Sequence, residues 1–185
     1  MGYNSKIAAL LGNGPSRKFY DPSKVYDYRL GCNIPWTDVD ATIILDENII
    51  KLWHKDHSLI KVPAYFSRNA WMYGDELKTF IPFIKENNYF IDIVDKIPNS
   101  NESSGNVATR KLVELGYTQI DIYGCDAYFT AAHGHNTKSY TRDFVSGIDM
   151  INNSYKWKLR WDEFIKKHPE VTFNFIKEAQ NVEQL

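Results

Sequence analysis

The sequence has few cysteines and no excess of charge of either sign. Cys32 and Cys125 are its two cysteines among 185 residues, and neither has a partner cysteine at metal-binding spacing. A chain of this size needs no disulfide for stability, so we expect reduced thiols in a cytoplasmic protein. Lys and Arg number 22 and Asp and Glu 23, a formal net charge of −1. This balance excludes the strong overall attraction of a basic protein to nucleic acid and leaves only a local basic groove for such a partner.

Long apolar segments are also missing. No apolar run approaches the roughly 20 residues of a membrane-spanning helix, so we expect no membrane span. Residues 1–11 hold a single Lys before a short apolar run, which is typical of a first strand and not of a signal peptide. The length favours a single domain over residues 1–185, alone or as a homo-oligomer.

Aromatic residues, in contrast, make up 15% of the chain, with 12 Tyr and 5 Trp. Such a content can supply a surface on which sugars or bases stack, but a tyrosine-rich core and surface is the more common explanation. Trp157, Trp161 and Phe164 recur at helical spacing before Pro169, which predicts the buried face of a helix. Composition by itself therefore indicates no ligand.

Three segments in the first 45 residues predict strands of a parallel sheet, and the first of them is an apolar run without the polar alternation of half-exposed strands. They cover residues 7–11, 28–33 and 41–45. Asn13, Asn33 and Asp46 stand at or just after the ends of these runs. Open parallel sheets bind ligands beyond the carboxyl ends of their strands, so we expect these side chains at a binding site. Asp46 is equally suited to cap the helix that follows.

A glycine-rich turn follows the first predicted strand: Gly12, Asn13, Gly14, Pro15 and Ser16. Backbone amides in such a turn can approach a phosphate closely. The turn lacks the Lys-Ser/Thr of a P-loop and the third glycine of the dinucleotide fingerprint. A tight strand-to-helix connection that begins at Pro15 explains it equally well.

Residues 103–128 carry the second group of candidate residues. Ser103, Ser104 and Gly105 open a predicted helix that ends at Gly116, and the unpaired N–H groups of a helix start can hold an anion. An apolar run at 120–124 predicts the next strand, and Asp126 and Tyr128 follow it. We interpret this unit as half of a nucleotide-binding crevice.

The rest of the chain continues the alternation of strands and helices. Further strands are predicted at 59–62, 89–94 and 171–176, an irregular aromatic stretch at 63–74, and a helix starting near Pro82. Residues 127–147 show no periodicity and are expected to form a lid over the crevice. The pattern predicts an α/β fold: a single Rossmann-like domain with a mostly parallel sheet flanked by helices and a lid loop.

Together these motifs resemble the small bacterial CMP-sialic-acid-dependent sialyltransferases that modify lipooligosaccharide. The family's Gly-Asn-Gly-Pro-Ser stands here at 12–16, and its Arg-Cys-Asn is approximated by residues 30–33. Its second signature, Thr-Ser-Gly followed by Leu-Gly-Tyr and Gly-x-Asp-x-Tyr, matches residues 103–105, 115–117 and 124–128. The resemblance spans roughly residues 5–48 and 102–136. A looser form of it extends to pterin-pyrophosphokinase-like proteins.

The resemblance implies roles for individual residues. Asn13 and Asn33 correspond to asparagines that hold the donor nucleotide, and Ser104 to a serine facing the donor's charged groups. Asp126 corresponds to an aspartate near the ribose and Tyr128 to a tyrosine that hydrogen-bonds the departing phosphate. With the lid realigned, Tyr140 matches a second phosphate-facing tyrosine.

A histidine of a Gly-His pair acts as base in that family. Gly134-His135 is the nearest match here, although it follows the Asp-x-Tyr segment sooner than expected, and His133 competes with it. A histidine suits this task because its ordinary pKa lies near 6.5.

Two departures from the family change the expected substrates. Asp46 stands where the family tends to have an Asn near the donor sugar, and a carboxylate 4 Å from that of sialic acid would be repelled by roughly 4 kcal/mol at an effective dielectric of 20. This favours a neutral sugar. The chain is also shorter than the family and lacks its membrane-associating extension, so we expect a soluble acceptor.

These observations predict a metal-independent glycosyltransferase that needs no cofactor and uses a CMP- or other pyrimidine-linked sugar donor. Its acceptor is a hydroxyl of a glycan, a small molecule or a modified nucleobase. Two alternatives stay open: a nucleotide-binding module without turnover, and a pyrophosphokinase-like transferase that uses ATP with Mg²⁺ on Asp46 and Asp126. The sequence names neither sugar nor acceptor.

Overall fold

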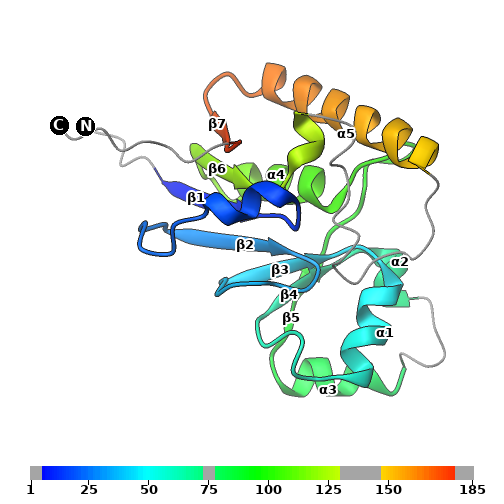
Figure 1. The fold of residues 1–185 in the computed structure, drawn as a ribbon. Coiled ribbons are helices and arrows are strands. Elements are labelled where there is room, and N and C mark those ends of the chain that lie inside the picture. The colour runs from blue at the N-terminus through cyan, green and yellow to red at the C-terminus, as the bar shows by residue number, and fades with distance from the viewer. Residues whose placement is uncertain (1–5, 73–77, 130–146, 178–185) are drawn as a thin grey trace.

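The computed structural model describes residues 6–72, 78–129 and 147–177, which form one seven-stranded parallel sheet with helices on both faces (Figure 1). The strand order is β5-β4-β3-β2-β1-β6-β7, and every neighbouring pair is parallel. The strands are β1 (Ile7–Leu11), β2 (Tyr28–Cys32), β3 (Ala41–Ile44), β4 (Ala64–Phe66), β5 (Phe90–Ile93), β6 (Gln119–Tyr123) and β7 (Thr172–Phe175). This confirms the predicted α/β class.

The helices divide between the two faces of the sheet. Their bounds are α1 (Glu47–Lys55), α2 (Arg68–Met72), α3 (Phe80–Glu86), α4 (Ser104–Glu114) and α5 (Gly147–Lys167), with 3₁₀ helices η1 (Pro15–Phe19) and η3 (Asp126–Tyr128). One apolar cluster joins α4 and α5 to β1, β2, β3 and β6, and a second joins α1 and α3 to β3 and β4. Because helices cover both faces, the strands are buried on both sides and read as continuous apolar runs.

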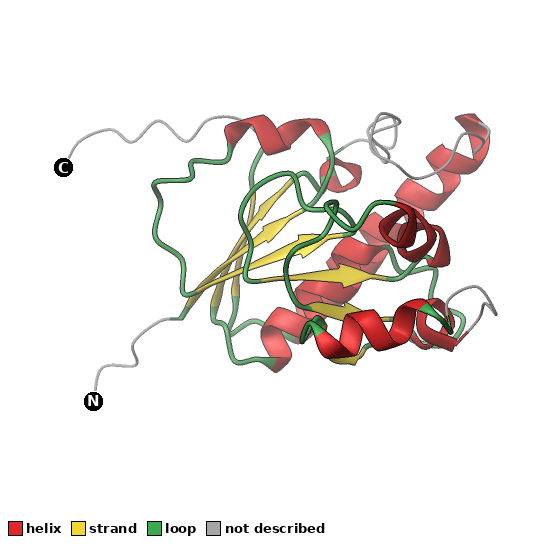
Figure 2. Cartoon of the chain, turned by 90° about the horizontal axis from the view of Figure 1, so that it is seen from below, coloured by secondary structure: helices red, strands yellow, loops and turns green. Residues whose placement is uncertain are grey.

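The chain reverses direction across the sheet once. It moves outward from β1 to β5, then returns through α4 to β6, which pairs with the opposite side of β1. All strands end at the same edge, as the arrowheads in Figure 2 show. The connections after β1 and β6 therefore lead away from each other, which creates the switch point where open α/β sheets bind ligands.

One strand prediction is wrong. Residues 59–62 form no strand; β4 begins two residues later, at Ala64, inside the stretch that we expected to be irregular and that also holds α2. Ile60 is fully buried in the core beside α1, which explains its apolar character without a strand. Pro63 has no N–H to donate, and its carbonyl accepts the Thr42 N–H at 3.0 Å just before the strand starts.

Local signals place most helix ends correctly. The Ser103 hydroxyl accepts the Asn106 N–H at 3.2 Å while the Asn106 carboxamide accepts the Ser103 N–H at 2.9 Å, a reciprocal cap at the start of α4. Gly116, with φ of 85°, follows its end. Helix α1 buries Ile49, Ile50 and Trp53. Helix α3 starts two residues before Pro82, which is compatible with a proline in the first turn.

No helix of the described ranges combines the length and apolarity needed to cross a membrane.

Candidate functional site

The glycine-rich turn after β1 lies directly against the turn after β6. The Gly12 N–H donates to the Tyr123 carbonyl and the Gly14 N–H to the Gly124 carbonyl, both at 2.8 Å. A Cβ on Gly12 would lie 2.5 Å from the Gly124 carbonyl oxygen. The two turns are thus in backbone contact at the switch point, and a side chain at either glycine position would separate them.

Ser16 and Asp126 lock these two turns together. The Asp126 Oδ2 accepts the Ser16 N–H at 3.0 Å and the Ser16 hydroxyl at 2.9 Å, and the Ser16 hydroxyl oxygen accepts the Gly124 N–H at 2.9 Å. Both residues are buried. A Cβ on Gly14 would lie 2.3 Å from the same Asp126 oxygen. The structure therefore gives Ser16, Gly14 and Asp126 a framework role in shaping the turn.

The two asparagines predicted to hold a nucleotide are neighbours. The Asn13 carboxamide donates through Nδ2 to the Cys32 carbonyl at 2.9 Å, which fixes it next to the residue before Asn33. Two hydrogen bonds hold the Asn33 backbone. The Asn33 N–H donates to the Ile43 carbonyl at 2.8 Å, and the Asn33 carbonyl accepts the Thr42 hydroxyl at 2.7 Å. Asn33 has a left-handed φ of 59°.

The side-chain oxygen of Asn33 is the site's unsatisfied acceptor. Its Oδ1 is buried and has no hydrogen-bond partner among the described residues. Leaving a buried acceptor unpaired costs about 1–3 kcal/mol. This unpaired acceptor follows β2 at the carboxyl edge of the sheet, the edge at which open parallel sheets bind ligands.

The start of α4 lies close to the glycine-rich turn after β1. A Cβ on Gly105 would lie 2.9 Å from the Cys125 Sγ, and one on Gly12 would lie 3.0 Å from that sulfur, so Cys125 sits between the helix start and the glycine-rich turn. The Ser103 hydroxyl is already used in the N-terminal cap of α4. The N–H groups of Ser104 and Gly105 donate to no described residue, as is usual in a first helical turn. Gly12 and the start of α4 therefore meet at Cys125, and Asn13 contacts the end of β2, directly before Asn33.

Both cysteines are free thiols packed in the core. Burial raises the pKa of Cys32 to about 12 and raises that of Cys125. Neither thiolate is accessible near neutral pH, so both act as small apolar residues in this structure.

Asp46 and Tyr128 lie at other points of this edge. Asp46 occupies the N-cap position of α1 without a side-chain bond to the helix, so its carboxylate is not used as a cap. The Tyr128 ring stacks on Phe175 at a centroid distance of 3.7 Å, with the Lys158 ammonium 5.0 Å above the ring centre. Stacking fixes the Tyr128 ring against the end of β7.

His133, His135 and Tyr140 lie outside the described residues, as does most of the predicted lid. Of residues 127–147, only 127–129 and Gly147 are described. The structure therefore leaves the base and the lid as predictions.

Sequence reasoning overlooked one motif, Asp38-Val39-Asp40, an Asp-x-Asp pair of the kind that can hold a divalent metal. It precedes β3, at the amino edge of the sheet, and the Asp40 carboxylate accepts the Arg29 N–H at 2.7 Å. Within the described ranges, no three His, Cys, Asp or Glu side chains are grouped for metal binding. The motif is thus at the opposite edge from the switch point.

A buried charge was also missed. Asp121 of β6 is fully buried and accepts hydrogen bonds from Lys24, Tyr26 and Asn174. Burial alone would raise the pKa of Asp121, but these hydrogen bonds and the Lys24 charge hold the pKa below its usual value. Its partners are remote in sequence, so no local signal predicted this network.

No protein-family model matches the sequence, and no curated protein matches it. Solved structures do resemble it. The monofunctional α-2,3-sialyltransferase Cst-I from Campylobacter jejuni has a TM-score of 0.57 at 17% identity, with 98% of this chain and 79% of that one covered. The sialyltransferase CstII from the same organism, in complex with the substrate analogue CMP-3FNeuAc, has a TM-score of 0.53 at 16% identity over 92% of this chain and 81% of that one.

A Cst-II variant in complex with CMP gives a TM-score of 0.54 at 18% identity, covering 96% of this chain and 82% of that one. At these identities the likeness defines the class of fold. The chain has the parallel α/β fold found in these sialyltransferases, and the predicted resemblance is confirmed at that level.

Proposed function

We propose that this protein is a glycosyltransferase that moves a sugar from a nucleotide-sugar donor, CMP- or other pyrimidine-linked, to a hydroxyl acceptor. The observation that carries the proposal is the unpaired, buried Asn33 Oδ1 beside Asn13 at the switch point. It supports a ligand with a hydrogen-bond donor, as the exocyclic amine of cytosine provides. The shared fold with enzymes solved with CMP and a CMP-sugar analogue supports the nucleotide class.

The start of α4 is suited to bind the donor phosphate. The N–H groups of Ser104 and Gly105 donate to no described residue, and the dipole of an 11-residue helix adds a partial positive charge. During transfer, negative charge accumulates on the departing phosphate. Donors already in place at that position stabilise the charge without reorganisation.

The remaining chemistry is assigned to residues at or beyond the carboxyl ends of the strands. We assign Tyr128 to the leaving phosphate and His135 or His133 to removal of the acceptor proton. The histidine would act as general base because a neutral imidazole accepts a proton near pH 7. Transfer is proposed to need no metal, because helix N–H groups and a tyrosine hydroxyl supply the electrophilic assistance.

Calorimetric titration with CMP, UMP, ADP and GDP tests the assignment. Tight binding of CMP or UMP, followed by product formation that needs a histidine, supports the transferase. Tight binding without product, unchanged by His135→Ala and His133→Ala, identifies a binding module. ATP binding that requires Mg²⁺ identifies a pyrophosphokinase-like enzyme. No binding of any nucleotide rejects the proposal.

A further inference from the structure

The connection from β5 to α4 delivers the chain to the proposed phosphate site. It leaves the edge strand at residue 94, where the Val94 N–H donates to the Phe66 carbonyl at 2.8 Å, and it ends at the Ser103 cap. Helix α4 packs on the central strands β1, β2 and β3, so the connection crosses from the sheet edge to its centre. Its position determines where the first turn of α4 lies.

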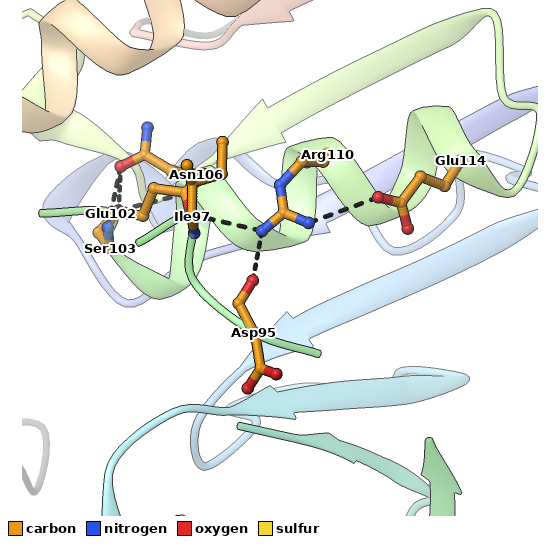
Figure 3. Close-up of polar contacts among 7 residues, drawn as sticks. All are labelled: Asp95, Ile97, Glu102, Ser103, Asn106, Arg110 and Glu114. Atoms are coloured by element: carbon orange, nitrogen blue, oxygen red, sulfur yellow. Dashed lines mark hydrogen bonds and ion pairs between the residues drawn. The ribbon is translucent and has the colours of Figure 1, made fainter. Parts of the chain in front are cut away.

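Arg110, in the second turn of α4, holds this connection in place (Figure 3). Its Nη2 donates to the Asp95 carbonyl at 2.6 Å and to the Glu102 Oε2 at 3.4 Å. The same Glu102 oxygen accepts the Ile97 N–H at 2.7 Å. One guanidinium therefore joins both ends of the segment 95–102 to the helix, and side chains that point toward the helix N-terminus make this reach possible.

Asp95 extends the connection to a further element. Its carboxylate accepts the Arg68 N–H at 3.0 Å and pairs with the Arg68 guanidinium at 3.2 Å, at the start of α2. Because Arg110 binds the carbonyl of the same residue, α2 and α4 are linked through Asp95. The link lies along the edge of the sheet that carries the candidate site.

The charge of Glu102 makes this arrangement relevant to anion binding. Glu102 directly precedes the N-cap, and its side chain is 6% exposed. A carboxylate there is attracted to the free N–H groups of the first turn, where it would compete with a phosphate and repel it. Arg110 neutralises the carboxylate, and the Ile97 N–H holds it.

The orientation of Arg110 leaves one of its own donors unpaired. Its Nε is buried without a partner in the described chain, which costs free energy. Its pair with Glu114, at 3.4 Å, is an ordinary i,i+4 contact worth little. The costly orientation points the guanidinium at Glu102 and Asp95.

We propose that Arg110 is a positioning residue for the donor phosphate: it neutralises Glu102 and holds it away from the first turn of α4, which leaves that turn open to an anion. This inference rests on the proposed function, because it assumes that a nucleotide phosphate binds there.

Four variants and calorimetry with CMP test the inference. Arg110→Leu leaves the Glu102 charge uncompensated and should raise the Kd for CMP about 10-fold, with KM for the donor rising and kcat retained. Arg110→Leu combined with Glu102→Gln removes both charges and should restore Kd to within about 3-fold of the wild type. Glu102→Gln alone should bind CMP at least as tightly as the wild type. Arg160→Leu, which breaks a surface pair with Glu163 on α5, is the matched control and should change nothing.

The double variant separates electrostatic positioning from structural support. If it binds CMP as weakly as Arg110→Leu, or if Glu102→Gln itself weakens binding 10-fold, the inference is wrong. It is also overturned if Arg110→Leu binds like the wild type. Should Arg110→Leu not fold, Arg110→Lys, which keeps the charge, must bind CMP within about 3-fold of the wild type, and Glu102→Gln decides as above. A wild-type protein that binds no nucleotide rejects the proposed function and this inference together, an outcome distinct from all the others.

Discussion

Replacing Asn33 with glycine should separate binding from stability at the candidate site. Glycine keeps the backbone contacts to Ile43 and Thr42 and removes the side chain whose Oδ1 is buried and unpaired. Loss of an acceptor that a ligand would use should weaken CMP binding by about 1–2 kcal/mol, or roughly 5- to 30-fold in Kd.

The stability of the free protein should change in the opposite direction. Removing an unpaired buried acceptor should raise the free energy of unfolding by about 1–3 kcal/mol. At a φ of 59°, glycine also relieves left-handed strain of about 1 kcal/mol, but its greater freedom in the unfolded chain offsets roughly 0.5–1 kcal/mol. We therefore expect Asn33→Gly to be more stable than the wild type by about 1–3 kcal/mol, or several degrees in Tm.

Asn88 provides the matched control. It has nearly the same φ, 57°, but lies exposed in the turn between α3 and β5. Asn88→Gly repeats the backbone change without the buried acceptor, so it should leave both Tm and CMP binding close to those of the wild type. Thermal melting and calorimetry on the three proteins provide the test. An Asn33→Gly protein that binds CMP unchanged, or that loses stability together with affinity, would falsify the assignment of Asn33 to the ligand.

Three further outcomes follow from the same structure. Ser104→Ala and Tyr128→Phe should each weaken CMP binding or slow transfer by about 10-fold, because each removes one hydroxyl near the departing phosphate; unchanged kinetics in both would remove the leaving-group assignment. Incubation with a chelator should leave transfer intact, whereas activity restored only by Mg²⁺ or Mn²⁺ would overturn the metal-free mechanism. Asp121→Asn should lower the free energy of unfolding by about 2–3 kcal/mol, less than a fully buried pair because the Lys24 side chain is 36% exposed. The pKa of Asp121 in the folded protein lies below its usual value of 3.8, so the carboxylate stabilises the fold at pH values above 3.8. Denaturation curves of the wild type should show this stabilisation being lost as the pH falls below the folded pKa. Curves of Asp121→Asn should lack this loss.

The contact between Arg110 and Glu102 left no signal in the sequence, for the same reason that the Asp121 network left none. Lys24 and Asp121 are remote in sequence, and Glu102 reads as one more polar residue in a loop. Burial and charge pairing depend on which segments of the chain contact one another, and the hydrophobic periodicity of a sequence does not predict those contacts. Similarly, the apolar run at 59–62 looks like a strand because core residues outside the sheet have the same composition.

Local sequence patterns predicted the α/β class, most of the strands and the start of α4, because parallel strands buried on both faces, helix caps and glycine stops leave local signals. They also indicated which polar residues end the strands. Which of these residues meet depends on the strand order: β6 lies beside β1, so the turn at Gly12 contacts Gly124, and Asp126 accepts hydrogen bonds from Ser16. The physical reason is that backbone conformation is set by near neighbours, whereas partners and burial are set by segments about a hundred residues apart.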